Sequence, residues 1–211
     1  PTTSSAASDV YKRQVNDHDF RSQADGIVIP HGIYDVGDNF GYLSLGNSKD
    51  TSAFVCDNLA YFWQNDLQWK YPNAQALLIL CDGGGSNNAS HYIVKQDLYW
   101  LAQKLDIDIL VAHYPPYCSK WNPIEHRLFC HVHRAWEGAV FQNMELVKEL
   151  AEMTTTSTGL GIKVRINDKE YQTKRQASPK FKNHIEKFVQ FDEKLPKWNY
   201  WVKTRKRKVI F

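Results

Sequence analysis

The chain has no apolar stretch approaching the roughly 18 residues that a membrane-spanning helix needs, and its first residues lack the charged-then-apolar pattern of a signal peptide. Cysteine is scarce. The four cysteines are scattered and form no C-x-x-C pair, which argues against a disulfide framework: Cys56, Cys81, Cys118 and Cys130. We therefore expect reduced thiols and a soluble, cytoplasmic protein.

The composition is that of a folded domain. The chain has 211 residues, of which 43% are hydrophobic and 13% aromatic, enough for one well-packed core with an appendage. The net charge is only +3, but basic residues crowd the last stretch of the chain, at Lys194, Lys197, Lys203, Arg205, Lys206, Arg207 and Lys208. Such a tail suits a polyanionic partner, and a solvated chain end is the alternative.

Three segments follow from the patterning. Residues 1–14 are small and polar, without helical or strand periodicity, and resemble the translated adapter sequence found at broken metagenomic reading frames, so they are predicted to be a non-native or disordered leader. Residues 15–160 are predicted to form one α/β domain. Residues 161–211 alternate short strand-like pieces with charged coil and are predicted to be a basic C-terminal appendage.

The domain begins with a predicted hairpin. Two strand-like runs, 27–36 and 42–45, flank a turn rich in glycine and Asx residues, which supply the positive φ angles of tight turns. Pro30 predicts that the first strand is interrupted or lies partly at a sheet edge. A helix is then predicted from Asp50 or Thr51 to about residue 64, because apolar residues recur on one side of it.

The most informative stretch follows. Residues 76–81 form an unbroken apolar run, predicted to be a central strand covered on both faces. Asp82 lies at its carboxyl end, where ligands gather in open α/β sheets. A helix over residues 90–105 and a second strand over 107–112 complete a right-handed crossover, so the two strands should be parallel.

A second carboxylate follows the second strand. Asn122 is a good helix N-cap and Pro123 suits the first helical position, which makes Glu125 the third residue of a helix. Glu125 could simply complete a capping box, and Asp82 could simply begin a turn. Together, however, they bring two carboxylates to one edge of the same α/β layer, an arrangement suited to holding divalent metal against phosphate.

Several motifs in this stretch carry a family resemblance. They are Asp82-Gly-Gly-Gly-Ser-Asn87, His113-Tyr-Pro-Pro, Ser119-Lys-Trp-Asn-Pro-Ile-Glu-His-Arg-Leu-Phe129, and Thr154-Thr-Thr with Thr158-Gly-Leu160. In this order and spacing, the sequence resembles the DDE transposases of bacterial insertion sequences, and its closest likeness is to the Rhodopirellula-type transposase DDE domain. The resemblance covers roughly residues 15–171.

The resemblance implies a ribonuclease-H-like α/β fold, a mixed sheet flanked by helices, in which three acidic residues bind two Mg²⁺ or Mn²⁺ ions. Asp82 then matches the second acid and Glu125 the third. Residues around the third acid would contact DNA phosphate, although a surface role without a ligand is equally open for each: Lys120, Trp121, Asn122, His126 and Arg127. The implied partners are DNA, as element ends and target, with a homo-oligomer on the DNA and association with the nucleoid as further expectations.

One part of the family pattern is missing. The first acid should lie on a first strand upstream of the hairpin, and nothing between Val15 and Pro30 matches that segment. Asp35 is the best substitute, although it lies on what would be the second strand. We therefore expect a fragment without its first strand, whose metal-dependent DNA cleavage and strand transfer are impaired. The alternatives are a ribonuclease-H-like nuclease and a decayed DNA-binding protein without catalysis.

Overall fold

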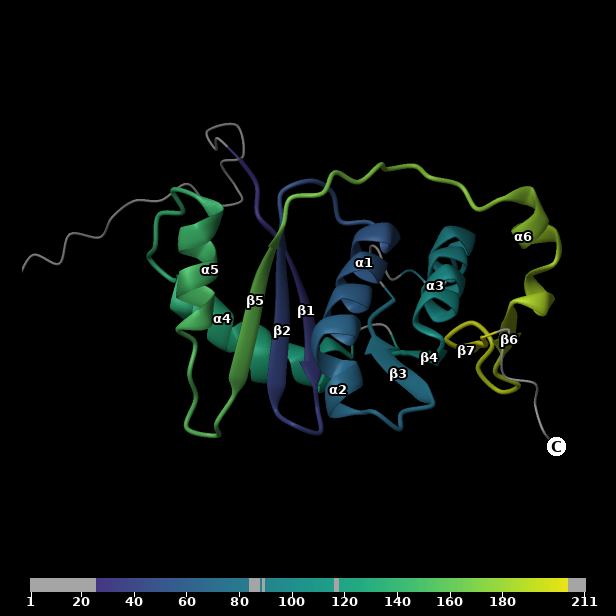
Figure 1. Ribbon diagram of the computed structural model, residues 1–211, viewed down its shortest axis with the longest axis horizontal. Coiled ribbons are helices and arrows are strands. Elements are labelled where there is room, and N and C mark those ends of the chain that lie inside the picture. Colours follow the sequence, from purple (N-terminus) through teal and green to yellow (C-terminus); the bar gives the residue numbers. More distant parts are fainter. Residues whose placement is uncertain (1–25, 84–87, 89, 116–117, 205–211) are drawn as a thin grey trace, which may run out of the picture.

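The computed structural model describes residues 26–83, 88, 90–115 and 118–204. The predicted leader and the last seven residues of the basic tail lie outside them. The described chain is an α/β fold in which mixed sheets are flanked by helices, as predicted (Figure 1). Its strands form two sheets. Sheet A has the order β1 (Ile29–Asp35), β2 (Phe40–Gly46), β5 (Gly161–Asn167), and sheet B has the order β3 (Ala76–Cys81), β4 (Asp108–His113), β7 (Asn199–Val202), β6 (Val189–Phe191).

Sheet A contains the predicted hairpin. β1 and β2 are antiparallel, with Ile29 opposite Gly46 and Asp35 opposite Phe40. Asn39 adopts φ 50° in the turn between them, a conformation that Asn tolerates better than most residues. Pro30 lies in β1, which among the described residues has a strand partner on one side only; this is the edge alternative predicted from Pro30.

Sheet B contains the predicted crossover. β3 and β4 are parallel, with Ala76 opposite Asp108, and helix α3 (Tyr92–Leu105) joins them. The prediction of a separate C-terminal appendage is wrong as far as residue 204. β5 pairs with β2, and β7 pairs with β4. Tyr200 and Val202 of β7 are almost completely buried in the core of sheet B, so this segment is an integral part of the sheets.

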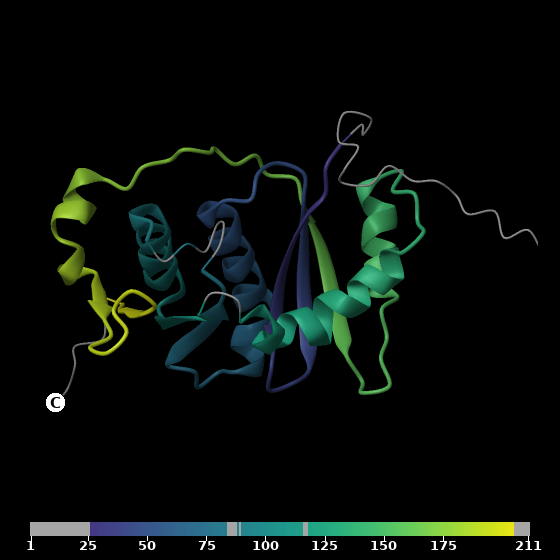
Figure 2. The same cartoon turned by 180° about the vertical axis from the view of Figure 1, so that it is seen from behind.

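Two helical layers cover the sheets. Helix α1 (Ser52–Phe62), continued by η2 (Trp63–Leu67) and α2 (Gln68–Lys70), lies with α3 on one side. The other side of sheet A is covered by η5 (Glu125–Phe129), α4 (Cys130–Trp136) and α5 (Met144–Glu152), as the view from behind shows (Figure 2). The remaining short helices are η4 (Ser119–Trp121), α6 (Pro179–Asn183) and η6 (Ile185–Lys187). Among the helices of the described ranges, none has the length and apolarity to cross a bilayer.

In both views β1 is the strand of sheet A nearest to sheet B, and β3 is the strand of sheet B nearest to sheet A (Figures 1 and 2). Within the described residues, β1 pairs only with β2 and β3 only with β4, so both facing edges lack a sheet partner. Ile33 of β1 and Ile79 of β3 nevertheless pack against the same buried cluster. The two sheets therefore share one core without sharing a hydrogen-bond ladder.

The prediction that β3 is covered on both faces is wrong. Its residues alternate, and Leu78 and Leu80 are 55% and 47% exposed. Their neighbours Leu77 and Ile79 pack toward the α1–α3 layer. The helices on the opposite side cover sheet A only, which leaves one face of β3 bare.

His31 of β1 gives a pH-dependent stability prediction. Its ring meets Phe54 edge-on at 5.8 Å between centroids, and its buried Nδ1 has no hydrogen bond with a described residue. Burial lowers the pKa of His31 from 6.5 to about 4. The unfolded chain takes up this proton near pH 6.5 and the folded chain only near 4. The free energy of unfolding should therefore fall as the pH drops through this range, by up to about 3 kcal/mol.

Urea unfolding at several pH values tests this prediction. The His31→Phe variant keeps an aromatic ring against Phe54 but cannot titrate, so its stability should change less between pH 6.5 and 4 than that of the parent. Parallel curves for the two proteins would show that another group is responsible.

Candidate active site

Asp82 directly follows β3 and its side chain is exposed. The strand ends beside it are fixed by the main chain, because the Tyr114 N–H donates to the Cys81 carbonyl at 2.9 Å. His113, at the end of β4, places Nδ1 2.6 Å from the Trp198 carbonyl oxygen. A side chain on Gly83 would come within van der Waals contact of the Trp198 ring. Trp198 therefore supports this edge, although nothing in the sequence near it indicated such a position.

Glu125 lies in the first turn of the predicted helix. Helical structure starts at Pro123, directly after Asn122, and the Glu125 N–H donates to the Asn122 carbonyl at 3.2 Å. The Glu125 side chain is exposed, whereas Leu128, three residues later, is fully buried. The turn is a π-turn, since the Cys130 N–H donates to the Glu125 carbonyl, and such turns occur frequently at functional sites.

We expect the two carboxylates to lie on the same side of the sheet layer. In β3, the residues that pack toward α1 and α3 alternate with Leu78 and Leu80 on the other face. Asp82 continues that second set by strand alternation. The helix that carries Glu125 also lies on the side away from α1, because a side chain at Gly32 of β1 would collide with Phe129. The alternation of β3 and the place of this helix on sheet A therefore predict that both acids lie on one side, next to the facing edges of β1 and β3.

Asp35, the expected substitute for the first acid, lies elsewhere. Its carboxylate accepts hydrogen bonds from Lys70 Nζ at 2.9 Å, Tyr71 Oη at 2.7 Å and the Gly37 N–H at 3.1 Å. Lys70 and Tyr71 precede β3, so Asp35 lies near the amino end of that strand, whereas Asp82 follows its carboxyl end. The described residues contain no group of three or more His, Cys, Asp or Glu side chains that could hold a metal. The structure therefore does not support Asp35 as a ligand alongside Asp82 and Glu125.

Comparison with sequence models of protein families matches residues 6–204 to the Rhodopirellula transposase DDE domain. The chain belongs to this family. Comparisons with curated proteins and with solved structures find no match. The family match extends through β5, β6 and β7, which agrees with their place in the two sheets. The DDE domain therefore includes most of the segment that the sequence pattern had separated as an appendage.

The predicted DNA-contacting residues of the DDE domain differ in exposure. Lys120, His126 and Arg127 are exposed, and Trp121 is 67% exposed. The Lys120 ammonium lies 5.2 Å from the centroid of the Trp121 ring, so a cation and an aromatic face are presented together. Asn122 is buried, and its carbonyl already serves the start of the helix. We therefore retain the other four as candidates for contact with phosphate.

Asp35 gives a second stability prediction. Partial burial raises the pKa of this carboxyl, but hydrogen bonds from Tyr71 and Lys70 outweigh burial and hold it below 3.8. Asp35→Asn should lower the free energy of unfolding by about 1 kcal/mol at pH 7. The stabilisation by the Asp35 carboxylate is complete above the pKa that this carboxyl has in the unfolded chain. It is lost as the pH falls through the lower pKa that the carboxyl has in the folded protein. The difference between parent and variant in urea unfolding should therefore shrink as the pH falls below 3.8, and a constant difference down to pH 3 would contradict it.

Proposed function

We propose that this DDE domain binds Mg²⁺ or Mn²⁺ through Asp82 and Glu125 and cuts and transfers DNA strands at the ends of an insertion element. Membership of a transposase family supports the reaction class. The observation that carries the proposal is that Asp82, directly after β3, and Glu125, at the start of a helix packed on β1, are both exposed. DNA is the partner that this activity requires, and the exposed cations Lys120 and Arg127 suit its phosphates.

The donor set fits a hard divalent cation. Both candidate ligands are carboxylates, which Mg²⁺ and Mn²⁺ prefer over thiolates. Both are exposed, so a metal ion and a DNA strand can reach them together. When bound, a pair of such ions activates the attacking oxygen and neutralises the leaving oxygen of an in-line displacement. The chain's own part is to hold Asp82 at a strand end and Glu125 at a helix start, two rigid positions.

We place the third carboxylate on a further strand between β1 and β3. Both facing edges lack a sheet partner among the described residues, and unpaired edges are templates for another strand. Such a strand would join sheets A and B into one. An acidic residue on its face away from α1 would then lie beside Asp82. Without that strand, the metal site has two carboxylates, and we expect strand cleavage by the described chain alone to be weak or absent.

A cleavage assay tests the proposal. A labelled DNA duplex that ends in the element's terminal sequence is incubated with Mn²⁺ and either this 211-residue chain or a longer protein that supplies the further strand, which we call the cleavage-competent protein. We expect nicking at the element end by the second protein and little by the first. Cleavage only of an RNA–DNA hybrid would favour a ribonuclease-H-like nuclease instead. DNA binding without cleavage by either protein would favour a non-catalytic DNA-binding protein.

A further inference from the structure

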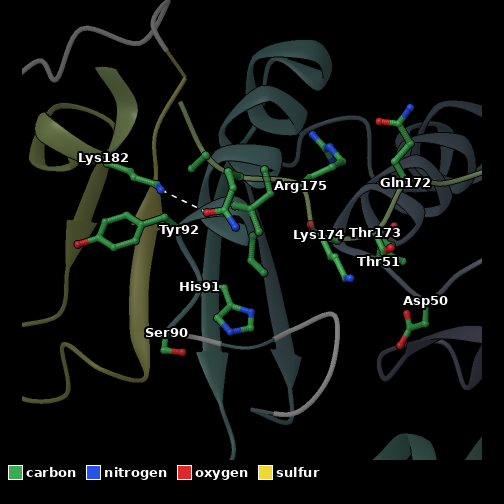
Figure 3. A pocket seen from close by; sticks show the side chains of 15 residues that line it. Asp50, Thr51, Ser90, His91, Tyr92, Gln172, Thr173, Lys174, Arg175 and Lys182 are labelled. Atoms are coloured by element: carbon green, nitrogen blue, oxygen red, sulfur yellow. Dashed lines mark hydrogen bonds between the residues drawn. The ribbon is translucent and has the colours of Figure 1, made fainter. Parts of the chain in front are cut away.

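A cavity of about 490 Å³ opens between the starts of α1 and α3 and the segment that joins β5 to α6 (Figure 3). Its volume is within the range of small-molecule sites. Its walls come from Asp50–Ser52, Ser90–Val94, Gln172–Ala177 and Lys182. The wall that comes from the start of α3 follows Asp82 closely in the sequence.

A buried ion pair fixes one wall of the cavity. Arg175 donates two hydrogen bonds to Asp97, both at 2.9 Å, and Ser52 Oγ donates to the same carboxylate at 2.6 Å. Asp97 is nine-tenths buried. These hydrogen bonds join the segment after β5 to both α1 and α3, and they keep that wall of the cavity in place. They also neutralise the charge of Arg175.

The remaining charge in the cavity is positive. Lys174 makes no hydrogen bond or ion pair with another described residue, and it adopts φ 60°. Lys182 Nζ has only a long hydrogen bond of 3.4 Å, to Gln176 Oε1. Among the described residues that line the cavity, the one acidic side chain is Asp50, and Figure 3 shows it on the same side as Lys174, across the cavity from Lys182. Two lysines without a carboxylate partner suit an anionic ligand.

An aromatic ring lies beside Lys182. Tyr92 is 45% exposed, and Figure 3 shows it next to Lys182 at one side of the cavity. Phosphate contacts from lysine combined with base stacking on an aromatic ring are the means by which proteins hold single-stranded nucleic acid. We propose that this cavity binds one unpaired nucleotide of a DNA strand, with one flanking phosphate near Lys174, the other near Lys182, and the base against Tyr92. This proposal rests on the proposed function only in taking DNA as the substrate.

Binding of a short single-stranded oligonucleotide with one 2-aminopurine, in EDTA, tests the proposal. In the Lys174→Gly, Lys182→Gln double variant we expect the affinity for the oligonucleotide to fall about tenfold. The slope of log affinity against log salt concentration should become less steep by about 1.4, the change expected when two phosphate contacts are lost. Glycine adopts φ 60° without strain, so the change at Lys174 should not reduce the melting temperature. Tyr92→Leu should abolish quenching of 2-aminopurine while affinity falls less.

Lys187→Gln is the matched control, because Lys187 is an exposed lysine on η6 outside the cavity. It should bind within twofold of the parent. The proposal is overturned if the double variant binds like Lys187→Gln, or if inorganic phosphate at millimolar concentration displaces the oligonucleotide as well as an unlabelled oligonucleotide does. Because no metal is present, failure of cleavage through Asp82 and Glu125 would leave this result untouched, and the two proposals can fail separately.

Discussion

Replacing Asp82 by Asn in the cleavage-competent protein should lower the rate of Mn²⁺-dependent DNA nicking by about a thousandfold, equivalent to about 4 kcal/mol of transition-state stabilisation. Asparagine keeps the size and one oxygen of the side chain but removes the negative charge that neutralises the cation. Glu125→Gln should have an effect of the same order, because both acids are proposed to hold the same metal site. Single-turnover cleavage of a labelled element end measures both.

Asp35→Asn is the control for this experiment. It also removes a carboxylate, but one already bound to Lys70 and Tyr71 near the other end of β3. Its cleavage rate should stay within about twofold of the parent at a temperature where it is folded. Circular dichroism should show native spectra for all three variants. Rates for Asp82→Asn and Glu125→Gln equal to that of Asp35→Asn would refute the assignment of the metal ligands.

Leu128→Ala should lower the free energy of unfolding by about 3 kcal/mol, as expected for a large-to-small change in a packed core. Leu128 is fully buried and anchors the helix that carries Glu125. It packs over Gly41 of β2, where an added methyl group would come within 2.4 Å of Leu128 Cδ1. Gly41→Ala alone should therefore also destabilise the fold, by about 1–3 kcal/mol.

A double-mutant cycle tests whether these two positions fill one space. In the Gly41→Ala, Leu128→Ala protein, the new methyl group occupies part of the volume that the leucine vacates. We expect the double variant to be more stable than the sum of the single effects predicts, by about 1 kcal/mol. Val147→Ala, a fully buried position on α5, should instead be closer to additive with Gly41→Ala. Strict additivity at position 128 would contradict the packing of this helix on β2.

The crossover unit was predictable because its signals are local. The apolar run at 76–81, the helical period of 90–105 and the Asn122-Pro123 helix start each depend on neighbours in sequence. They located β3, α3 and the helix of Glu125 within one or two residues. The candidate ligands Asp82 and Glu125 could be named for the same reason, since each lies at the boundary of a strongly patterned element.

The features that the sequence did not predict depend on contacts between residues far apart in the chain. β5 was recognised as strand-like, but its parallel pairing with β2 across more than a hundred residues has no local signal. The role of Asp35 could not be read from the hairpin, because its partners Lys70 and Tyr71 follow α1. Likewise, the run at 76–81 is apolar throughout, and only the arrangement of the helices shows that Leu78 and Leu80 remain exposed.

The most direct test of the central claim is anomalous diffraction from crystals of the cleavage-competent protein soaked with Mn²⁺. The predicted result is an anomalous peak within coordination distance of the Asp82 and Glu125 carboxylates, which is lost in Asp82→Asn crystals soaked in the same way. An anomalous peak held only by Asp35, or Asp82 and Glu125 side chains directed to opposite sides of the sheet layer, would contradict the proposed metal site.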